Sequence, residues 1–166
     1  MLFGTQYGDQ EFTFTEGLYN LGNILFSQIG GSMGPIYGTI FMDAADAGTD
    51  LEEITVKDLA DMLSAGLSGL QEIVEAQVGD KTLVDTLSPA VDALKDAASS
   101  GTDFKEALEN MKTAARKGME STRDLVAKYG RSSRLGERSR GVLDAGSVSC
   151  CIILTALADG IAENLA

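Results

Sequence analysis

The chain has 166 residues, 44% of them hydrophobic and 23% charged, which is the composition of a globular protein and excludes a disordered one. This length suffices for one domain with a sizeable core. The formal net charge of −12 excludes the usual basic nucleic-acid-binding protein.

The N-terminal part of the chain predicts an arm followed by a helix. Residues 1–13 are polar and aromatic without a regular period, so they predict a loose arm. A helix with Thr15 as its cap is predicted over residues 14–29, because apolar residues recur there at helical spacing. The residues that carry this spacing are Leu18, Leu21, Leu25 and Ile29.

A glycine-rich stretch, GGSMGPIYG (Gly30–Gly38), separates this helix from one predicted to begin near Ile36 and to reach residue 47. Glycine lets the backbone approach a ligand because it has no Cβ. A helix start adds free amides and the positive end of the helix dipole, which favours an anion site. An ordinary turn between helices, with Gly31 as the cap and Pro35 at the next start, explains the same residues.

Three further helices are predicted in the middle of the chain. Thr55 and Asp103 are predicted N-caps, and Pro89 marks a helix start or a kink. A break is predicted at VGDKT, residues 78–82. The three helices are expected over residues 55–76, 83–98 and 104–128.

A second glycine-rich loop, Tyr129–Ser147, concentrates positive charge in an acidic chain. Five basic residues fall within the 13 positions from 128 to 140, where only Glu137 opposes them, and they are Lys128, Arg131, Arg134, Arg138 and Arg140. They could contact a phosphorylated ligand or an acidic partner, or they could pair with acidic helices nearby. The loop ends in DAGS (Asp144–Ser147) at a predicted helix start, which favours a second anion site.

The C-terminal helix is expected over residues 147–165 and contains the longest apolar run, Val148–Ala158. A bilayer takes about 20 apolar residues, so this run predicts a buried core helix and no membrane association. The adjacent Cys150 and Cys151 favour a reduced protein. Residues 1–8 lack the basic start and apolar run of a signal peptide, so we expect a cytoplasmic protein.

These elements predict an all-α protein of about six helices that forms a single domain over residues 1–166. No stretch shows the sustained alternation of a β-strand. The chain contains no histidine, which excludes a histidine-activated nucleophile, a histidine-bound metal and a phosphohistidine on this chain.

Three segments resemble, in order and spacing, the L subunit of dihydroxyacetone kinase, its nucleotide-binding subunit. The resemblance extends from about Leu18 to Leu165, and its segments are GGSMGPIYGTIF, VGDKTLVDTLSPAVDAL and GRSSRLGERSRGVLDAGS. It implies an antiparallel helical barrel that binds ADP or ATP with magnesium at one open end. It also implies that phosphate passes through the nucleotide to dihydroxyacetone on a K subunit, and that a phosphohistidine protein is the donor in the bacterial branch.

The resemblance implies nucleotide-binding residues in each segment and assigns no catalytic residue. The first segment would hold phosphate oxygens, one residue of the second would lie near the nucleotide, and the third would close the site. Asp144 is also a carboxylate with which Arg138 could pair. The implied binding residues are Gly30, Gly31, Ser32, Met33, Thr82, Arg138, Asp144 and Gly146.

The sequence departs from the family pattern at its N-terminal end. The family binds magnesium through aspartates of a GDxDHG-like loop, whereas YGDQEF offers only Asp9 and Glu11. Met33 stands where the family has Ser or Thr, and Ala145 stands where it has Pro. We therefore expect either that the first helix and the aspartate loop lie outside this sequence or that this is a member without them.

The sequence leaves two alternatives open for the function. The chain is a phosphotransferase subunit, or it is a non-catalytic paralogue that binds a ligand or partner without transferring phosphate. A barrel without its first helix leaves apolar faces uncovered, so self-association is a further expectation.

Overall fold

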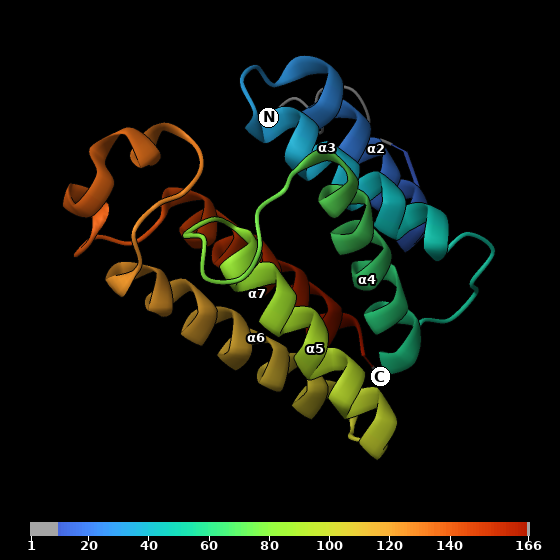
Figure 1. Ribbon diagram of the computed structural model, residues 1–166. Helices are drawn as coiled ribbons and strands as arrows, with labels where there is room; N and C mark the ends of the chain where they lie inside the picture. Colours follow the sequence, from blue (N-terminus) through green and yellow to red (C-terminus); the bar gives the residue numbers. More distant parts are fainter. Residues whose placement is uncertain (1–9, 166) are drawn as a thin grey trace. The chain divides into compact units, whose positions relative to one another are not determined.

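The computed structural model describes residues 10–165 (Figure 1). This part of the chain contains six α-helices, two 3-10 helices and no strand, so the predicted all-α class is confirmed. The described residues fall into two compact units, 10–74 and 75–165, and each is considered by itself. The single domain and the barrel arrangement stay predictions.

The first unit consists of three helices in sequence. They are α2 (Phe14–Gln28), α3 (Met33–Ala47) and α4 (Val56–Ile73). Helix α3 packs against both of its neighbours (Figure 1). Its glycines permit this close packing, because a Cβ added at Gly38 would lie 2.6 Å from the Cβ of Phe26. The glycines of the first motif therefore serve helix packing as well as the turn.

Helix α2 begins with a capping box at Thr13, not at Thr15 as predicted. The Thr13 hydroxyl accepts a hydrogen bond from the Glu16 N–H at 3.2 Å, and the Glu16 carboxylate accepts one from the Thr13 N–H at 2.9 Å. This exchange requires an acidic residue three positions after the cap, which Thr13 has and Thr15 lacks. The predicted cap at Thr55 is confirmed and makes the same exchange with Asp58.

Helix α3 begins at Met33, earlier than the sequence predicted. The backbone turns at Gly31, whose φ of +77° favours glycine. The next residue, Ser32, already has helical φ and ψ angles. The positive φ at Gly31 thus completes the turn within GGS, and the remaining glycines of the stretch are helical.

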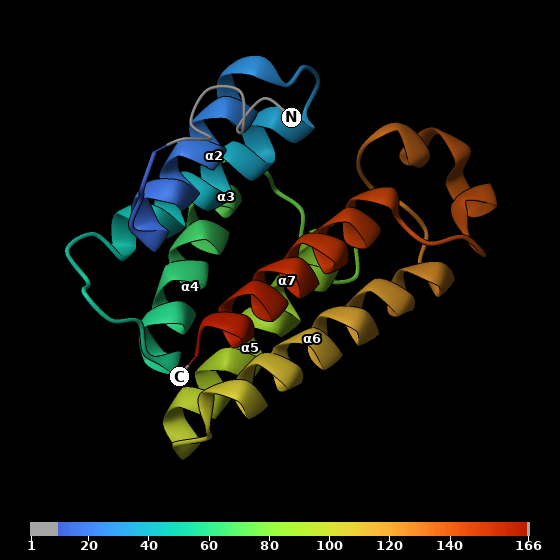
Figure 2. The same ribbon diagram turned by 180° about the vertical axis from the view of Figure 1, so that it is seen from behind.

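The second unit contains three longer helices and two short ones. The α-helices are α5 (Val84–Ser100), α6 (Phe104–Ser121) and α7 (Ala145–Asn164), and they pack against one another (Figure 2). The 3-10 helices are η1 (Thr122–Asp124) and η2 (Arg131–Ser139). The predicted cap of α6 is confirmed, because the Asp103 carboxylate accepts the N–H of Lys105 at 2.9 Å.

Two predictions about this unit were wrong. Helix α6 does not continue to Lys128, because the chain tightens into η1 and becomes extended at Leu125. The second glycine-rich loop is also more regular than expected, since much of it forms η2 with a kink at Gly136. Glycine-rich sequence gives no helical period, so η2 could not be recognised from spacing.

Helix α7 is buried on one side only. Its buried residues include Cys150, Cys151 and Leu154, and burial raises the pKa of the Cys150 thiol. Ile152 is 63% exposed. Within the described residues, α7 alone is long and apolar enough to cross a membrane by length and composition. The C-terminal helix is therefore close to its predicted extent but more exposed than a buried core helix.

Candidate functional site

The start of α3 is an open helix N-terminus. Ser32 is its N-cap, but no side-chain hydrogen bond caps the first turn. A Cβ added at Gly30 or Gly31 would meet no heavy atom within 4 Å. Free amides at a helix start attract anions, and these glycines leave room for a ligand to approach. This end of α3 therefore has the features of a phosphate site.

The start of α7 is tied to the loop before α5. The Ser147 hydroxyl donates to the Thr82 carbonyl at 2.5 Å, and the Thr86 hydroxyl donates to the Ser147 carbonyl at 3.2 Å. Ser147 and Thr86 are fully buried. Because buried polar groups need partners, these bonds fix the first turn of α7 relative to Thr82.

Asp144 caps α7 with its own carboxylate. Its Oδ2 atom accepts the Ser147 N–H at 2.8 Å. Burial raises the pKa of this carboxyl, while hydrogen bonds from the Ser147 and Gly146 amides oppose the rise. The anion site predicted at DAGS is thus already filled by a negatively charged side chain of the protein.

Gly146 lies in a place where a side chain would not fit. A Cβ there would lie 2.9 Å from the Asp144 carboxylate and 3.4 Å from the Leu83 backbone nitrogen. The glycine therefore lets the first turn of α7 approach both the cap and the loop before α5. This supports the interpretation of Gly146 as part of a closely packed site.

Two buried aspartates shape the loop over residues 77–82. The Asp85 carboxylate accepts the N–H groups of Gly79 at 2.6 Å and Thr82 at 2.7 Å. The Asp80 carboxylate accepts the Gln77 N–H at 2.9 Å and forms an ion pair with Lys128. The Lys128 ammonium and then the Gln77 amide lower the pKa of Asp80. The break predicted here is confirmed, and carboxylates hold it in one conformation.

Lys81 was missed by the sequence reasoning. It is only 2% exposed, and its ammonium donates to the backbone carbonyls of Thr122, Leu125 and Val142. Its position inside VGDKT, beside the site residue Thr82, was the available signal. The break was interpreted only as a turn, and lysine in a turn is usually exposed.

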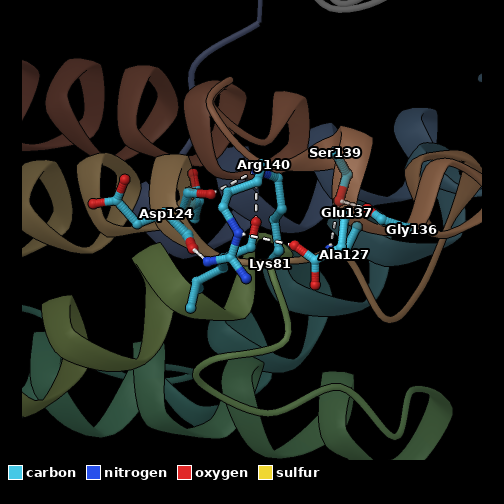
Figure 3. Close-up of polar contacts among 9 residues, drawn as sticks. Lys81, Asp124, Ala127, Gly136, Glu137, Ser139 and Arg140 are labelled. Atoms are coloured by element: carbon cyan, nitrogen blue, oxygen red, sulfur yellow. Dashed lines mark hydrogen bonds and ion pairs between the residues drawn. The ribbon is translucent and has the colours of Figure 1, made fainter.

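The basic residues of the second loop have different surroundings. Arg140 bonds the Asp124 carbonyl and the Glu137 carboxylate (Figure 3), and Lys128 pairs with Asp80. Within the described part of the chain, the side chains of Arg131, Arg134 and Arg138 are exposed and take part in no hydrogen bond or ion pair. In particular, Arg138 does not pair with Asp144.

The end of η2 is anchored by a serine. The Ser139 hydroxyl donates to the Gly136 carbonyl at 2.7 Å and accepts the Ala127 N–H at 3.0 Å (Figure 3). Ser139 is fully buried. These bonds hold the end of η2 on the backbone that follows η1, while Arg138, the residue before Ser139, extends from this anchored segment into solvent.

The predicted site residues thus fall into three groups. Thr82, Asp144 and Gly146 lie together at the start of α7. Arg138 belongs to the same unit but contacts none of the three through a hydrogen bond or ion pair. Gly30 to Met33 belong to the other unit, at the start of α3.

Metal ligands are considered only among the described residues. Among residues 10–165, no group of three or more His, Cys, Asp or Glu side chains is arranged to hold a metal ion. Glu11 is exposed, and Asp9 lies outside the described residues. The magnesium that the resemblance implied therefore stays a prediction, and no step of the chemistry is assigned to a metal.

The DAK2 domain family matches residues 6–159. The ADP-binding subunit DhaL of the PEP-dependent dihydroxyacetone kinase of Escherichia coli is 36% identical over 141 residues, 85% of this chain and 67% of that subunit. The corresponding subunit of kinase 2 from Listeria innocua is 35% identical and is covered to 64%. The chain therefore spans about two thirds of these relatives.

A solved structure has the same fold. The crystal structure of the dihydroxyacetone kinase of C. freundii superposes with a TM-score of 0.63 over 88% of this chain and 24% of that one, at 23% identity. This likeness agrees with the all-α class, and the family match covers most of the chain. The chain belongs to the DAK2 domain family.

Proposed function

We propose that this chain is the nucleotide-binding phosphotransferase subunit of a dihydroxyacetone kinase. It would pass phosphate through bound ADP or ATP to dihydroxyacetone held by a K subunit. The main support is its similarity to subunits that are named ADP-binding subunits of such kinases. The open N-terminus of α3 adds a feature that phosphate groups favour.

The residues of the chain suit binding of a nucleotide rather than covalent transfer. With no histidine, the chain has no imidazole to carry phosphate, so the phosphoryl group would stay on the nucleotide. The backbone amides of Gly31 and Ser32 would donate hydrogen bonds to phosphate oxygens. The exposed guanidinium of Arg138 is suited to bidentate contact with phosphate.

The names of the relatives support a proposal about the partners of this chain. Some relatives are named PEP-dependent and one PTS-dependent, and a phosphohistidine protein is the donor that we propose for this chain. The acceptor would be dihydroxyacetone on a separate subunit. We also propose a cytoplasmic location, where both partners would meet the chain.

Isothermal titration calorimetry with ADP tests nucleotide binding. Gly31→Ala and Gly101→Ala form a matched pair, because both glycines have positive φ, at +77° and +68°, and open space where a Cβ would be added. Both substitutions therefore carry the same left-handed strain of roughly 1 kcal/mol. We expect only Gly31→Ala to weaken ADP binding, and an equal effect at Gly101 would contradict the site at α3.

Magnesium should add little to binding by this chain. The described residues contain no acidic cluster for the ion, and without it the phosphates lack their strongest counter-charge. We expect weak ADP binding with a small change on adding magnesium. Submicromolar, magnesium-dependent affinity would contradict this expectation and would indicate a metal site elsewhere in the chain.

The lack of an acidic cluster among the described residues also favours the second candidate, a non-catalytic paralogue. A transfer assay separates the two functions. The chain is mixed with ATP, dihydroxyacetone and a dihydroxyacetone-binding subunit, and dihydroxyacetone phosphate is measured. Product formed only when the chain is present supports the kinase, whereas ADP binding without product supports the binding module.

A further inference from the structure

Lys81 is a buried ammonium with all of its donors satisfied by backbone. Its Nζ atom lies 2.6 Å from the Thr122 carbonyl oxygen, 2.7 Å from that of Val142 and 3.2 Å from that of Leu125. An ammonium has three N–H groups and no acceptor, so this arrangement uses its full capacity. We call Lys81 and these three carbonyl groups the Lys81 cluster; Figure 3 shows Lys81 beside Arg140.

The Lys81 cluster joins three segments that are distant in the sequence. Thr122 is the first residue of η1, Leu125 directly follows η1, and Val142 lies in the loop before α7. The separations along the chain from Lys81 are 41, 44 and 61 residues. A single ammonium therefore holds the backbone before and after residues 128–140, the basic loop that carries the five basic side chains.

The loop that carries Lys81 is itself fixed. Asp85 binds the N–H groups of Gly79 and Thr82, on either side of Lys81. Lys81 has a φ of +62°, an unfavourable conformation for a residue with a Cβ. Such strain persists where the surroundings determine the conformation, and it concentrates at functional sites.

A short chain of bonds leads from Lys81 to the cap of α7. The Thr122 carbonyl accepts from Lys81, and the Thr122 hydroxyl accepts the Asp144 N–H at 3.0 Å. The Asp144 carboxylate in turn holds the Ser147 N–H. The backbone of Asp144 is thus two hydrogen-bonded links away from the buried ammonium.

Packing alone does not account for a lysine at this place. Burial of an ammonium is costly, and it lowers the pKa of Lys81 despite the nearby Asp144 carboxylate. An apolar side chain would fill a core without this cost. It would, however, leave the Leu125 and Val142 carbonyl groups without their donor and the Thr122 carbonyl with only the Leu125 N–H at 3.3 Å, so the lysine determines how these segments meet.

We propose that Lys81 is a positioning residue for the nucleotide site: it sets the loop at Val142 and the cap at Asp144 relative to Thr82. The proposal rests on the proposed nucleotide binding. Lys81 does not itself contact the ligand in this role. Its removal would shift the start of α7, which carries Asp144 and Gly146, and nucleotide affinity would fall.

Lys81→Met tests this role, with ADP titration and thermal unfolding as paired measurements. The matched control is Leu108→Ala in α6, a fully buried residue of the same unit outside the Lys81 cluster. We expect both variants to lower Tm, and only Lys81→Met to raise the Kd for ADP at least tenfold. Lys81→Arg, which keeps the charge and donors, should recover part of the affinity.

Thr122→Val supplies a second test if Lys81→Met does not fold. It removes the hydroxyl that accepts the Asp144 N–H and keeps the carbonyl that accepts from Lys81, so it too should raise the Kd. Parent-like ADP affinity in Lys81→Met or, if that variant does not fold, in Thr122→Val would overturn the proposal. An equal rise in Kd for Leu108→Ala at the same loss of Tm would also overturn it.

Hydrogen exchange of the nucleotide-free protein separates this proposal from the proposed function. If the parent does not bind ADP, the proposed function fails, but the exchange measurement still tests Lys81. Faster exchange in Lys81→Met confined to residues 122–125 and 142–147, the segments that the Lys81 cluster joins, supports the positioning role. Faster exchange spread evenly over residues 75–165 would overturn it.

Discussion

The Ser147 hydroxyl donates a hydrogen bond of 2.5 Å to the carbonyl oxygen of Thr82, which lies 65 residues earlier in the chain. Ser147 is fully buried, so water does not compete for this contact. The bond joins the first turn of α7 to the loop before α5. It places two of the predicted site residues, Thr82 and Gly146, on backbone segments that cannot move independently.

Ser147→Ala should therefore destabilise the protein. The substitution removes a hydrogen bond to the Thr82 carbonyl, which keeps only the Asp85 N–H as a donor at 3.1 Å, and loss of such a bond costs about 0.5–1.5 kcal/mol. Urea unfolding measures the change. The control is Ser99→Ala, which removes an exposed hydroxyl bonded at 2.8 Å to the Lys95 carbonyl within α5 and should change stability by less than about 0.5 kcal/mol. Equal midpoints for Ser147→Ala and the parent would contradict this role.

Local features of the fold were predictable from the sequence. The caps at Thr55 and Asp103 depend on residues only two or three positions away. The same rule applied two residues earlier, at Thr13, would have found the cap, because Glu16 is the acidic residue that a capping box needs three positions on. The prediction named the wrong threonine as the cap, although the capping rule itself holds for this helix.

Features that depend on distant contacts were not predictable in this way. The role of Lys81 exists only because Thr122 and Val142 come together in three dimensions. The early end of α6 depends on that meeting too, since η1 and the residue after it supply two of the carbonyl groups. Likewise, the spacing of charges in the second loop could not show that Arg140 is bonded while Arg138, within the described residues, is not.

Gly118→Ala and Gly160→Ala should have opposite effects on stability. A Cβ at Gly118 of α6 would lie 2.0 Å from the Asp85 carbonyl oxygen, whereas one at Gly160 of α7 would meet nothing within 4 Å. Overpacking typically costs about 1–3 kcal/mol. Alanine at an unstrained helical position adds about 0.4–1 kcal/mol. Thermal or urea unfolding of the two variants checks the signs, and a stabilised Gly118→Ala would refute the close approach of α6 to α5.

The ion pair of Asp80 with Lys128 should make stability depend on pH in the acid range. The pKa of Asp80 is lowered from 3.8, first by Lys128 and then by the Gln77 amide. A carboxyl with a lowered folded-state pKa stabilises the fold above its unfolded pKa of about 4, and this contribution is lost as the pH falls through the folded pKa. Asp80→Asn should therefore lower Tm at pH 7 and have a smaller effect near pH 3.

Asp92→Asn is the control for this measurement. Asp92 is exposed on α5, and its side chain has no hydrogen bond or ion pair within the described residues. The substitution should leave Tm unchanged at both pH values. A loss of Tm for Asp80→Asn that is the same at pH 3 as at pH 7 would show that the carboxylate charge does not stabilise this loop.

Arg138 is the residue of the basic loop that we expect to contact nucleotide phosphate. The chain carries a net charge of −12, so a phosphate ligand needs local positive charge, and screening limits help from charges beyond about 8 Å. Lys128 and Arg140 are already paired with carboxylates. Arg138 has no such partner among residues 10–165 and precedes Ser139, whose buried hydroxyl anchors this end of η2.

Arg138→Ala should lower nucleotide affinity by roughly 2 kcal/mol or more, about 30-fold, as for loss of a charge-assisted hydrogen bond. Because Arg138 makes no contact that stabilises the described fold, its Tm should equal that of the parent. Arg138→Lys keeps the charge but loses the two-pronged geometry, so it should remain impaired. Arg131→Ala and Arg134→Ala, at exposed positions farther from the anchored end, should each cost less. Calorimetry with ADP measures the affinity of all four variants. If Arg138→Ala binds ADP like the parent while Arg131→Ala binds it more weakly, the phosphate contact lies elsewhere in the loop.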